Sequence, residues 1–394
     1  MLMKGHIIKH DIHSCLLKCK NLMLPLRKNL KCPPKNNKLF GVLDSPLENE
    51  IVGSVIGIEG WCLSQKEDDL EIEVYVDDHL ITKSKRNDTR LDVGNAYPDI
   101  KNSHKGGFYI ETNLENFEDG IHFLKIFANS SHNTKIIDNK KFILKKNELL
   151  PPKRLRESIG ARGPYGNFKL LGQKHLNFFI ELCHLKKDEH VLDVGCGVGR
   201  MAAALTEFLS REGKYEGFDI VPEAIEWNKK IITPQFPNFH FSLANIYNKH
   251  YNKISKISAE SYTFPYPNAT FDFVFLTSVF THIHPNEFEN YLSEISRVLK
   301  KNGRCYSTFF LLNDESRNLM NSKNCRINFN FNFNGFSSSN EETPEHGIAL
   351  PEEFVLESFK KNNLDVVKPI IYGFWCGRKS TINGQDIVIA FKNK

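Results

Sequence analysis

The sequence predicts an α/β fold, a mostly parallel sheet with helices on both faces, preceded by an all-β sandwich domain. Three observations support this. From residue 190 onward, short apolar segments alternate with amphipathic helical segments, which favours parallel strands joined by helices. Before residue 147, strand-like segments follow one another, separated by Gly, Asn and Asp. At the start of the α/β region, a buried strand runs directly into a glycine-rich turn at 190–199.

Composition limits the class of protein. The chain has 394 residues, enough for two domains, and it is 40% hydrophobic and 25% charged, as in globular proteins. Its 9 cysteines form no Cys-x-x-Cys pair and no zinc spacing, so we expect free thiols in a reducing compartment and no metal site. No apolar run approaches the roughly 18 residues of a membrane span. We therefore expect a cytoplasmic protein.

Residues 1–38, which precede the first predicted domain, form a basic tail. The first 40 residues hold Lys or Arg at nine positions (4, 9, 18, 20, 27, 28, 31, 35 and 38) against one acid, Asp11. One interpretation is a solvated, disordered tail that ends at Pro33-Pro34. The other is electrostatic contact with an anionic membrane surface, which would place the protein peripherally at the inner membrane face.

Residues 39–147 are predicted to form the sandwich. The candidate strands are Ile51–Trp61, Glu71–Val76, His79–Lys83, Gly107–Glu111, His122–Ala128 and Lys135–Leu144. Asp77-Asp78 supplies a tight hairpin turn, and Trp61 is interpreted as a core residue rather than a platform for a sugar. Residues 148–185 follow as a linker and a helical segment that either closes over a ligand as a lid or packs on the edge of the sheet.

Residues 186–394 are predicted to form the α/β domain. Its strands are expected at His190–Val194, Tyr215–Asp219, Phe239–Leu243, Phe271–Leu276, Gly303–Phe310, Asp365–Tyr372 and Asp386–Phe391. Its helices are expected from Arg200, and at Pro222–Lys230, Asn286–Leu299 and Pro351–Asn362. Ligands of such sheets bind at the carboxyl ends of the strands, where Asp193 and Asp219 both fall.

Four motifs in order carry a family resemblance. They are the run Val191–Gly199, an acid at Asp219, Phe264-Pro265-Tyr266 before Phe271–Val274, and Arg297–Gly303 before a strand. Together they resemble a class I S-adenosylmethionine-dependent methyltransferase. The resemblance implies a Rossmann-like sheet of seven strands whose last strand, Asp386–Phe391, is antiparallel. The sandwich, in turn, looks like the Ig-like modules attached to some bacterial glycosyltransferases and glycan-modifying enzymes.

The same resemblance implies S-adenosyl-L-methionine as the cofactor. It places the methionyl part beside the glycine turn with Asp193 at the amino group, Asp219 at the ribose hydroxyls, and Asn245 near the adenine amine. The full set of implied cofactor-binding residues is Asp193, Gly195, Cys196, Gly197, Gly199, Arg200, Asp219, Ile220, Asn245, Ile246 and Thr277.

The segment after the fourth strand carries the candidate catalytic residues. His282 is the first candidate for a general base and His284 the second, because an imidazole accepts protons near neutral pH. The alternative is that His282 caps the turn from strand to helix or packs at the rim of the cofactor.

The acceptor is expected to bind in later segments. These hold Glu345, Trp375 and Arg378, and an inserted strand is predicted within 324–336. The match from Thr277 to Asp386 resembles methyltransferases of bacterial surface-glycan gene clusters, which implies transfer of methyl to a saccharide hydroxyl. The alternatives are another small molecule or a lipid as acceptor, a nicotinamide-dependent oxidoreductase, and a binding module. No motif points to nucleic acid, and the oligomeric state stays open.

Overall fold

A computed structural model describes residues 39–66, 69–131, 133–158, 165–248, 255–321, 324–379 and 382–393. The basic tail, residues 1–38, lies outside this part of the chain, so its contact with a membrane stays a prediction. None of the helices within the described ranges has the length and apolarity needed to cross a membrane.

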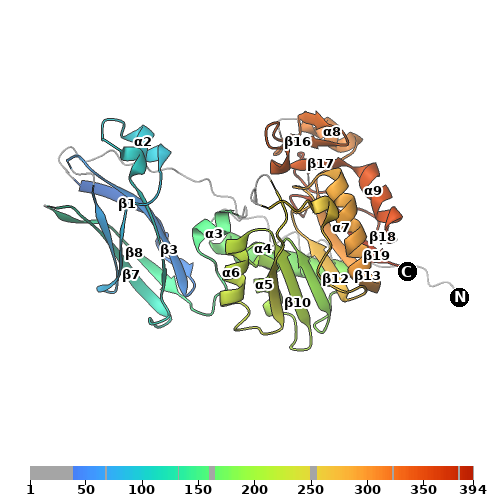
Figure 1. The fold of residues 1–394 in the computed structure, drawn as a ribbon, viewed down its shortest axis with the longest axis horizontal. Coiled ribbons are helices and arrows are strands. Elements are labelled where there is room, and N and C mark those ends of the chain that lie inside the picture. The colour runs from blue at the N-terminus through green and yellow to red at the C-terminus, as the bar shows by residue number, and fades with distance from the viewer. Residues whose placement is uncertain are drawn as a thin grey trace.

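Two antiparallel sheets form the N-terminal domain (Figure 1). The three-stranded sheet has the order β1-β3-β6, with β1 at Leu39–Ser45, β3 at Val55–Ser64 and β6 at Gly107–Asn113. The second sheet has the order β2-β8-β7-β4-β5, in which β2 alone pairs in parallel. Its strands are β2 Glu50–Val52, β4 Glu71–Val76, β5 His79–Lys85, β7 Gly120–Asn129 and β8 Thr134–Leu144. A short helix, α2 (Leu91–Ala96), precedes the 3₁₀ turn at Ser103–Lys105.

One apolar core lies between these two sheets. It takes alternate side chains from β3, β4, β7 and β8, including Ile58, Val74, Ile126 and Phe142, all fully buried. Asp77 and Asp78 both have positive φ, as the predicted tight hairpin between β4 and β5 requires. Trp61 is 5% exposed and packs against Phe40 and Tyr97, as a core residue does.

The single strand predicted at Ile51–Trp61 is two strands. The chain leaves the sheet at Gly53, where a Cβ atom would lie 2.9 Å from the Glu148 carbonyl oxygen. The glycine therefore allows the segment that leads out of the sandwich to pass close to this break.

That segment enters two helices, α3 (Lys153–Ser158) and α4 (Tyr165–Cys183). Figure 1 shows α3 on the side of the second domain that faces the sandwich. Helix α4 packs against α5 and β13, so its buried face covers the large sheet.

The large sheet has seven strands in the order β11-β10-β9-β12-β13-β19-β18. The first five are parallel and β19 and β18 are antiparallel to their neighbours. The strands are β9 His190–Val194, β10 Lys214–Asp219, β11 Phe239–Leu243, β12 Phe271–Leu276, β13 Leu299–Phe309, β18 Leu364–Val366 and β19 Asp386–Lys392. The direction of winding reverses between β9 and β12, the position where such sheets bind ligands.

Helices cover both faces of this sheet because successive side chains of its strands point to opposite sides. Leu192 and Val194 join one buried cluster with α7 and α9, whereas Val191 and Tyr215 join the other with α4, α5 and α6. The helices are α5 Arg200–Thr206, α6 Pro222–Ile231, α7 Pro285–Val298 and α9 Glu352–Lys361, with a 3₁₀ turn at Ala259–Ser261.

A small sheet of order β14-β17-β16-β15 sits beside the carboxyl ends of the large sheet (Figure 1). Its elements are β14 Leu311–Leu312, α8 Asp314–Met320, β15 Phe331–Phe333, β16 Phe336–Ser338, the 3₁₀ turn Pro344–His346, and β17 Ile348–Pro351. The strand predicted within 324–336 is thus the hairpin β15-β16, turned at Gly335 with positive φ. The predicted strand Asp365–Tyr372 is also shorter: β18 ends at Val366, and Pro369, which has no N–H to donate, separates it from an isolated bridge between Ile371 and Ile387.

Candidate active site

A cavity of about 640 Å³ opens at the carboxyl ends of β9, β10 and β12. Its walls come from the glycine turn after β9, the loops after β10, β11 and β12, helix α3, and the small sheet. Ten of the sequence-predicted residues line it, namely Asp193, Gly195, Cys196, Gly197, Arg200, Asp219, Ile220, Ile246, Thr277 and His282. The cavity therefore lies at the position that strand order alone indicates.

The glycine turn has a backbone that side chains would obstruct. Gly195 has a φ of 80°, and a Cβ atom there would lie 2.4 Å from Val279 Cγ2. Gly199 has a φ of 74°, and its Cβ would meet Asn228 Oδ1 at 2.6 Å. Both positions need glycine for conformation and for space. Gly199 is the N-cap of α5 and does not itself line the cavity.

Asp219 connects β10 to this turn. Its Oδ2 accepts a 2.7 Å hydrogen bond from the Gly197 N–H, and its Oδ1 accepts one of 3.0 Å from the Val221 N–H. Burial raises the pKa of this carboxyl, while the backbone donors oppose the shift. Each carboxylate oxygen has a second lone pair, so the side chain can still accept bonds from two hydroxyls of a ligand.

Asp193 is the most buried acid of the site, at 1% exposure. Its Oδ2 accepts a 2.7 Å hydrogen bond from Tyr215 Oη, but its Oδ1 has no hydrogen-bond partner among the described residues. Burial raises its pKa to about 8, and the neighbouring Asp219 carboxyl adds to the rise. Nearby, Arg200 Nε is also buried without a partner in the described chain. An acidic and a basic side chain that each keep one buried polar atom without a hydrogen-bond partner suit a ligand that carries both charges.

Asn245 does not reach the cavity wall. Its side chain is exposed, and its carbonyl oxygen accepts a 2.6 Å bond from Ser255 Oγ. Its neighbour Ile246, 2% exposed, lines the cavity instead.

His282 lies on the cavity wall after β12. Its Nδ1 is 2.7 Å from the carbonyl oxygen of Glu345, on the small sheet's 3₁₀ turn. A carbonyl only accepts, so Nδ1 carries the proton, and Nε2 is the basic nitrogen of the neutral ring.

His284 has a different position. It is the N-cap of α7, where its N–H donates to Glu287 Oε2 at 2.7 Å, and its Nε2 lies 3.5 Å from Glu345 Oε1. It is not among the residues that line the cavity. The capping role considered for His282 is therefore occupied by His284.

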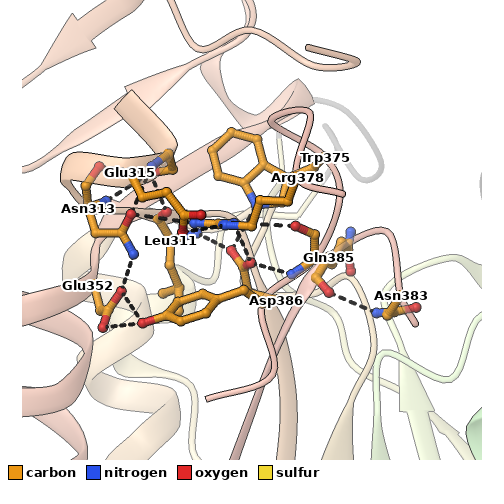
Figure 2. A network of polar contacts seen from close by, with 12 residues as sticks. Leu311, Asn313, Glu315, Glu352, Trp375, Arg378, Asn383, Gln385 and Asp386 are labelled. Atoms are coloured by element: carbon orange, nitrogen blue, oxygen red, sulfur yellow. Dashed lines mark hydrogen bonds and ion pairs between the residues drawn. The ribbon is translucent and has the colours of Figure 1, made fainter. Parts of the chain in front are cut away.

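Trp375 and Arg378 also stay outside the cavity and belong to a buried network (Figure 2). Its centre is Asp386, fully buried, which accepts bonds from the Leu311 N–H, the Gly373 N–H and Trp375 Nε1 at 2.7, 2.7 and 2.8 Å. Arg378 Nη1 lies 3.3 Å from the same carboxylate, and its Nε donates to Glu315. The network fastens the small sheet to β19.

Several wall residues were not selected individually by sequence reasoning. They are Glu157 on α3, Ser278 and Thr281 between the selected Thr277 and His282, and Ser339, His346 and Gln385 from later segments. Ser278 Oγ donates to Gln385 Oε1 at 3.0 Å. Only the folded chain brings the later segments to this wall, so no local pattern could have identified Ser339, His346 and Gln385. Within the described residues, no cluster of three or more His, Cys, Asp or Glu side chains could hold a metal ion.

Residues 192–307 match a family model whose description is methyltransferase domain. The chain carries an S-adenosylmethionine-dependent methyltransferase domain. The matched segment contains the glycine turn, Asp219 and His282, and this decides between the methyl donor and the nicotinamide cofactor that the sequence left open. S-adenosylmethionine is thus the cofactor of this methyltransferase.

Three of the solved structures similar to the methyltransferase come from two archaea and a bacterium. A protein of Pyrococcus horikoshii OT3 is 15% identical over 60% of this chain and 93% of that chain, with a TM-score of 0.41. A SAM-dependent methyltransferase of Methanosarcina mazei is 20% identical over 54% and 97%, with a TM-score of 0.37. The Burkholderia thailandensis 1,6-didemethyltoxoflavin-N1-methyltransferase, solved with 1,6-didemethyltoxoflavin and S-adenosylhomocysteine, is 16% identical over 56% and 79%, with a TM-score of 0.36.

The wall of the cavity fits this cofactor. S-adenosylmethionine carries an ammonium and a carboxylate on its methionyl part, which complement the partnerless oxygen of Asp193 and the buried Nε of Arg200. The glycine turn leaves the backbone open where a side chain would fill the space.

Proposed function

We propose that this methyltransferase transfers the methyl group to a hydroxyl of a saccharide, within a surface glycan. The proposal rests on the position of His282, which lines the cavity and donates from Nδ1 to the Glu345 carbonyl oxygen. A hydroxyl acceptor must lose a proton during transfer, and a neutral imidazole with Nε2 as its basic nitrogen can take it.

The cofactor roles follow from the same wall. We assign Asp193 to the ammonium of the cofactor and Asp219 to its ribose hydroxyls, with the turn 195–199 beside the methionyl part. Ile220, Ile246 and Thr277 lie along the same wall, where apolar side chains can pack against an adenine ring. Asn245 keeps no direct role in this assignment, because its side chain is exposed.

Methyl transfer of this kind needs no covalent catalysis by the protein. When bound, S-adenosylmethionine supplies a methyl group already activated on a sulfonium. The O–CH₃ bond forms as the S–CH₃ bond breaks, and the hydroxyl proton passes to His282 Nε2. The contribution of the chain is to align the acceptor and to receive that proton.

The composition of the wall supports a hydroxylated acceptor. Beyond the cofactor residues, Ser278, Thr281, Ser339 and Gln385 present hydrogen-bonding groups, as recognition of a sugar ring requires. The apolar side chains of Phe310 and Ile327 on the same wall keep a different small molecule or a lipid as the second candidate.

Incubation with radiolabelled methyl donor tests the proposal. The panel holds nucleotide sugars, lipid-linked glycans and small alcohols, together with amines and free lipids as competitors. We expect label only on saccharide hydroxyls, and loss of transfer by about 10²-fold or more in His282→Gln with unchanged affinity for S-adenosylhomocysteine. His240→Gln, at an exposed histidine on β11, is the matched control. Label on amines or lipids alone, or full activity of His282→Gln, would contradict the proposal.

A further inference from the structure

Helix α3 is bound to the sandwich through three basic side chains. Lys153 Nζ lies 3.4 Å from Glu59 Oε2, Arg154 Nη2 3.2 Å from Asp88 Oδ1, and Arg156 Nη2 3.1 Å from Glu50 Oε1. The acids belong to three separate segments of the sandwich: β3, the loop after β5, and β2. One short helix is therefore held at three points along its length.

The pair between Arg156 and Glu50 is the most buried of the three, with side chains 4% and 7% exposed. Arg156 Nε and Nη1 have no hydrogen-bond partner in the described chain. A buried guanidinium with two unfilled donors depends strongly on its one carboxylate, because removing that carboxylate leaves an uncompensated charge. The pair thus fixes where α3 can lie.

Two other residues of α3 contact the cofactor side. Leu155 packs on a buried cluster that includes Val198 of the glycine turn and Ala224 of α6. The next-but-one residue, Glu157, lines the same cavity as Asp193 and Asp219. The helix therefore connects the sandwich to the wall of the cavity in about one and a half turns.

We propose that the sandwich completes the cofactor site by fixing α3, and that Glu157 is a cofactor-binding residue positioned in this way. The inference rests on the proposed cofactor site. S-adenosylmethionine brings an ammonium and a sulfonium, and an added carboxylate on the wall raises the affinity for such a cation. The N-terminal domain thereby contributes to catalysis without contacting the reacting atoms.

Calorimetry of the full-length chain with S-adenosylhomocysteine and S-adenosylmethionine tests this without any acceptor. We expect Glu157→Gln to weaken binding at least fivefold with an unchanged melting temperature. If the variant loses more affinity for S-adenosylmethionine than for S-adenosylhomocysteine, Glu157 contacts the sulfonium. If it loses the same affinity for both ligands, Glu157 contacts the ammonium. Binding of both ligands within twofold of the wild-type value would overturn the proposal.

A double-mutant cycle tests the positioning step. Glu50→Gln should weaken binding as Glu157→Gln does, and the double variant should bind no more weakly than Glu157→Gln alone, since both changes remove one contribution. Asp44→Asn is the matched control, because its partner Arg90 lies within the sandwich, 2.6 Å away. Additive losses, or an equal loss in Asp44→Asn, would contradict positioning through α3.

A second variant and the binding of the wild-type chain distinguish the possible outcomes. If Glu50→Gln does not fold, Asp88→Asn removes the more exposed pair of the same helix and should give a smaller loss of the same kind. If the wild-type chain binds neither ligand, the cofactor site itself is wrong, whereas wild-type binding with unaffected Glu157→Gln rejects only the role of α3.

Discussion

The hydroxyl of Tyr215 donates a 2.7 Å hydrogen bond to Asp193 Oδ2 across the neighbouring strands β10 and β9. Both side chains are buried, and the second carboxyl oxygen has no partner within the described residues. The tyrosine holds the acid in one orientation, with its other oxygen available to a ligand.

Binding of S-adenosylhomocysteine should release a proton below pH 8. Burial raises the pKa of Asp193 to about 8 in the chain alone, and a bound ammonium favours the ionised carboxylate, so the complex holds fewer protons. Affinity should therefore fall as pH falls from 7.5 to 5.5, by up to about tenfold per unit. Calorimetry in buffers of different ionisation enthalpy measures the released proton. Asp193→Asn should bind more weakly and release no such proton, and an identical pH dependence in this variant would be evidence against the assignment.

Gly195→Ala should abolish most of the cofactor affinity. The new Cβ would lie 2.4 Å from Val279 Cγ2, at a φ of 80° that costs a non-glycine residue about 1–2 kcal/mol. We expect at least a tenfold loss of affinity for S-adenosylhomocysteine. Gly120→Ala is the control, because that site has a φ of 151° with nothing within 4 Å of the new Cβ. It should lower the melting temperature and leave binding unchanged, and the reverse pattern would show that the turn does not contact the cofactor.

Asp219→Ala should remove hydrogen bonds both within the glycine turn and to the cofactor. The Gly197 and Val221 N–H groups lose their acceptor, and the ribose hydroxyls lose theirs, so binding should weaken on the order of 10²-fold. Asp219→Asn keeps one acceptor oxygen and should lie between the alanine variant and the wild type. Titration by intrinsic fluorescence gives the three constants. Wild-type affinity in the alanine variant would refute the role given to this acid.

Asp386→Ala should destabilise the fold rather than the cofactor site. It leaves the Leu311 N–H, the Gly373 N–H and Trp375 Nε1 without their acceptor, and it removes one of the partners of the Arg378 guanidinium (Figure 2); such losses cost about 3–5 kcal/mol. Urea unfolding should show a loss of this size. An Asp365→Ala control, at an exposed acid on β18, should change stability by less than about 0.5 kcal/mol. An equal effect of the two changes would mean that the network does not hold the small sheet.

The parallel core could be predicted from sequence because β9 is a short, mostly apolar segment that runs directly into a glycine turn. Val191, Leu192 and Val194 are buried on both faces, and this pattern has few other interpretations. The ends of the strands and the inserted segments were harder to predict from the sequence. The predicted strand to Tyr372 ends early at Val366, and the run within 324–336 folds as a hairpin around Gly335.

Prediction of the acceptor side from sequence was less successful for a physical reason. Trp375 and Arg378 have the residue types of a binding pocket, but their hydrogen bonds go to Asp386 and Glu315 within the fold. The wall is instead made of side chains such as Thr281 and Ser339, whose residue types are unremarkable in the sequence. Their function depends on tertiary neighbours that only the folded chain brings together.

The most direct test of the central claim is calorimetry of the full-length chain with S-adenosylhomocysteine and, separately, with NAD. The cavity built on Asp193, Asp219 and the turn 195–199 predicts saturable binding of one S-adenosylhomocysteine per chain and no heat from NAD. Binding of NAD without binding of S-adenosylhomocysteine would contradict the account.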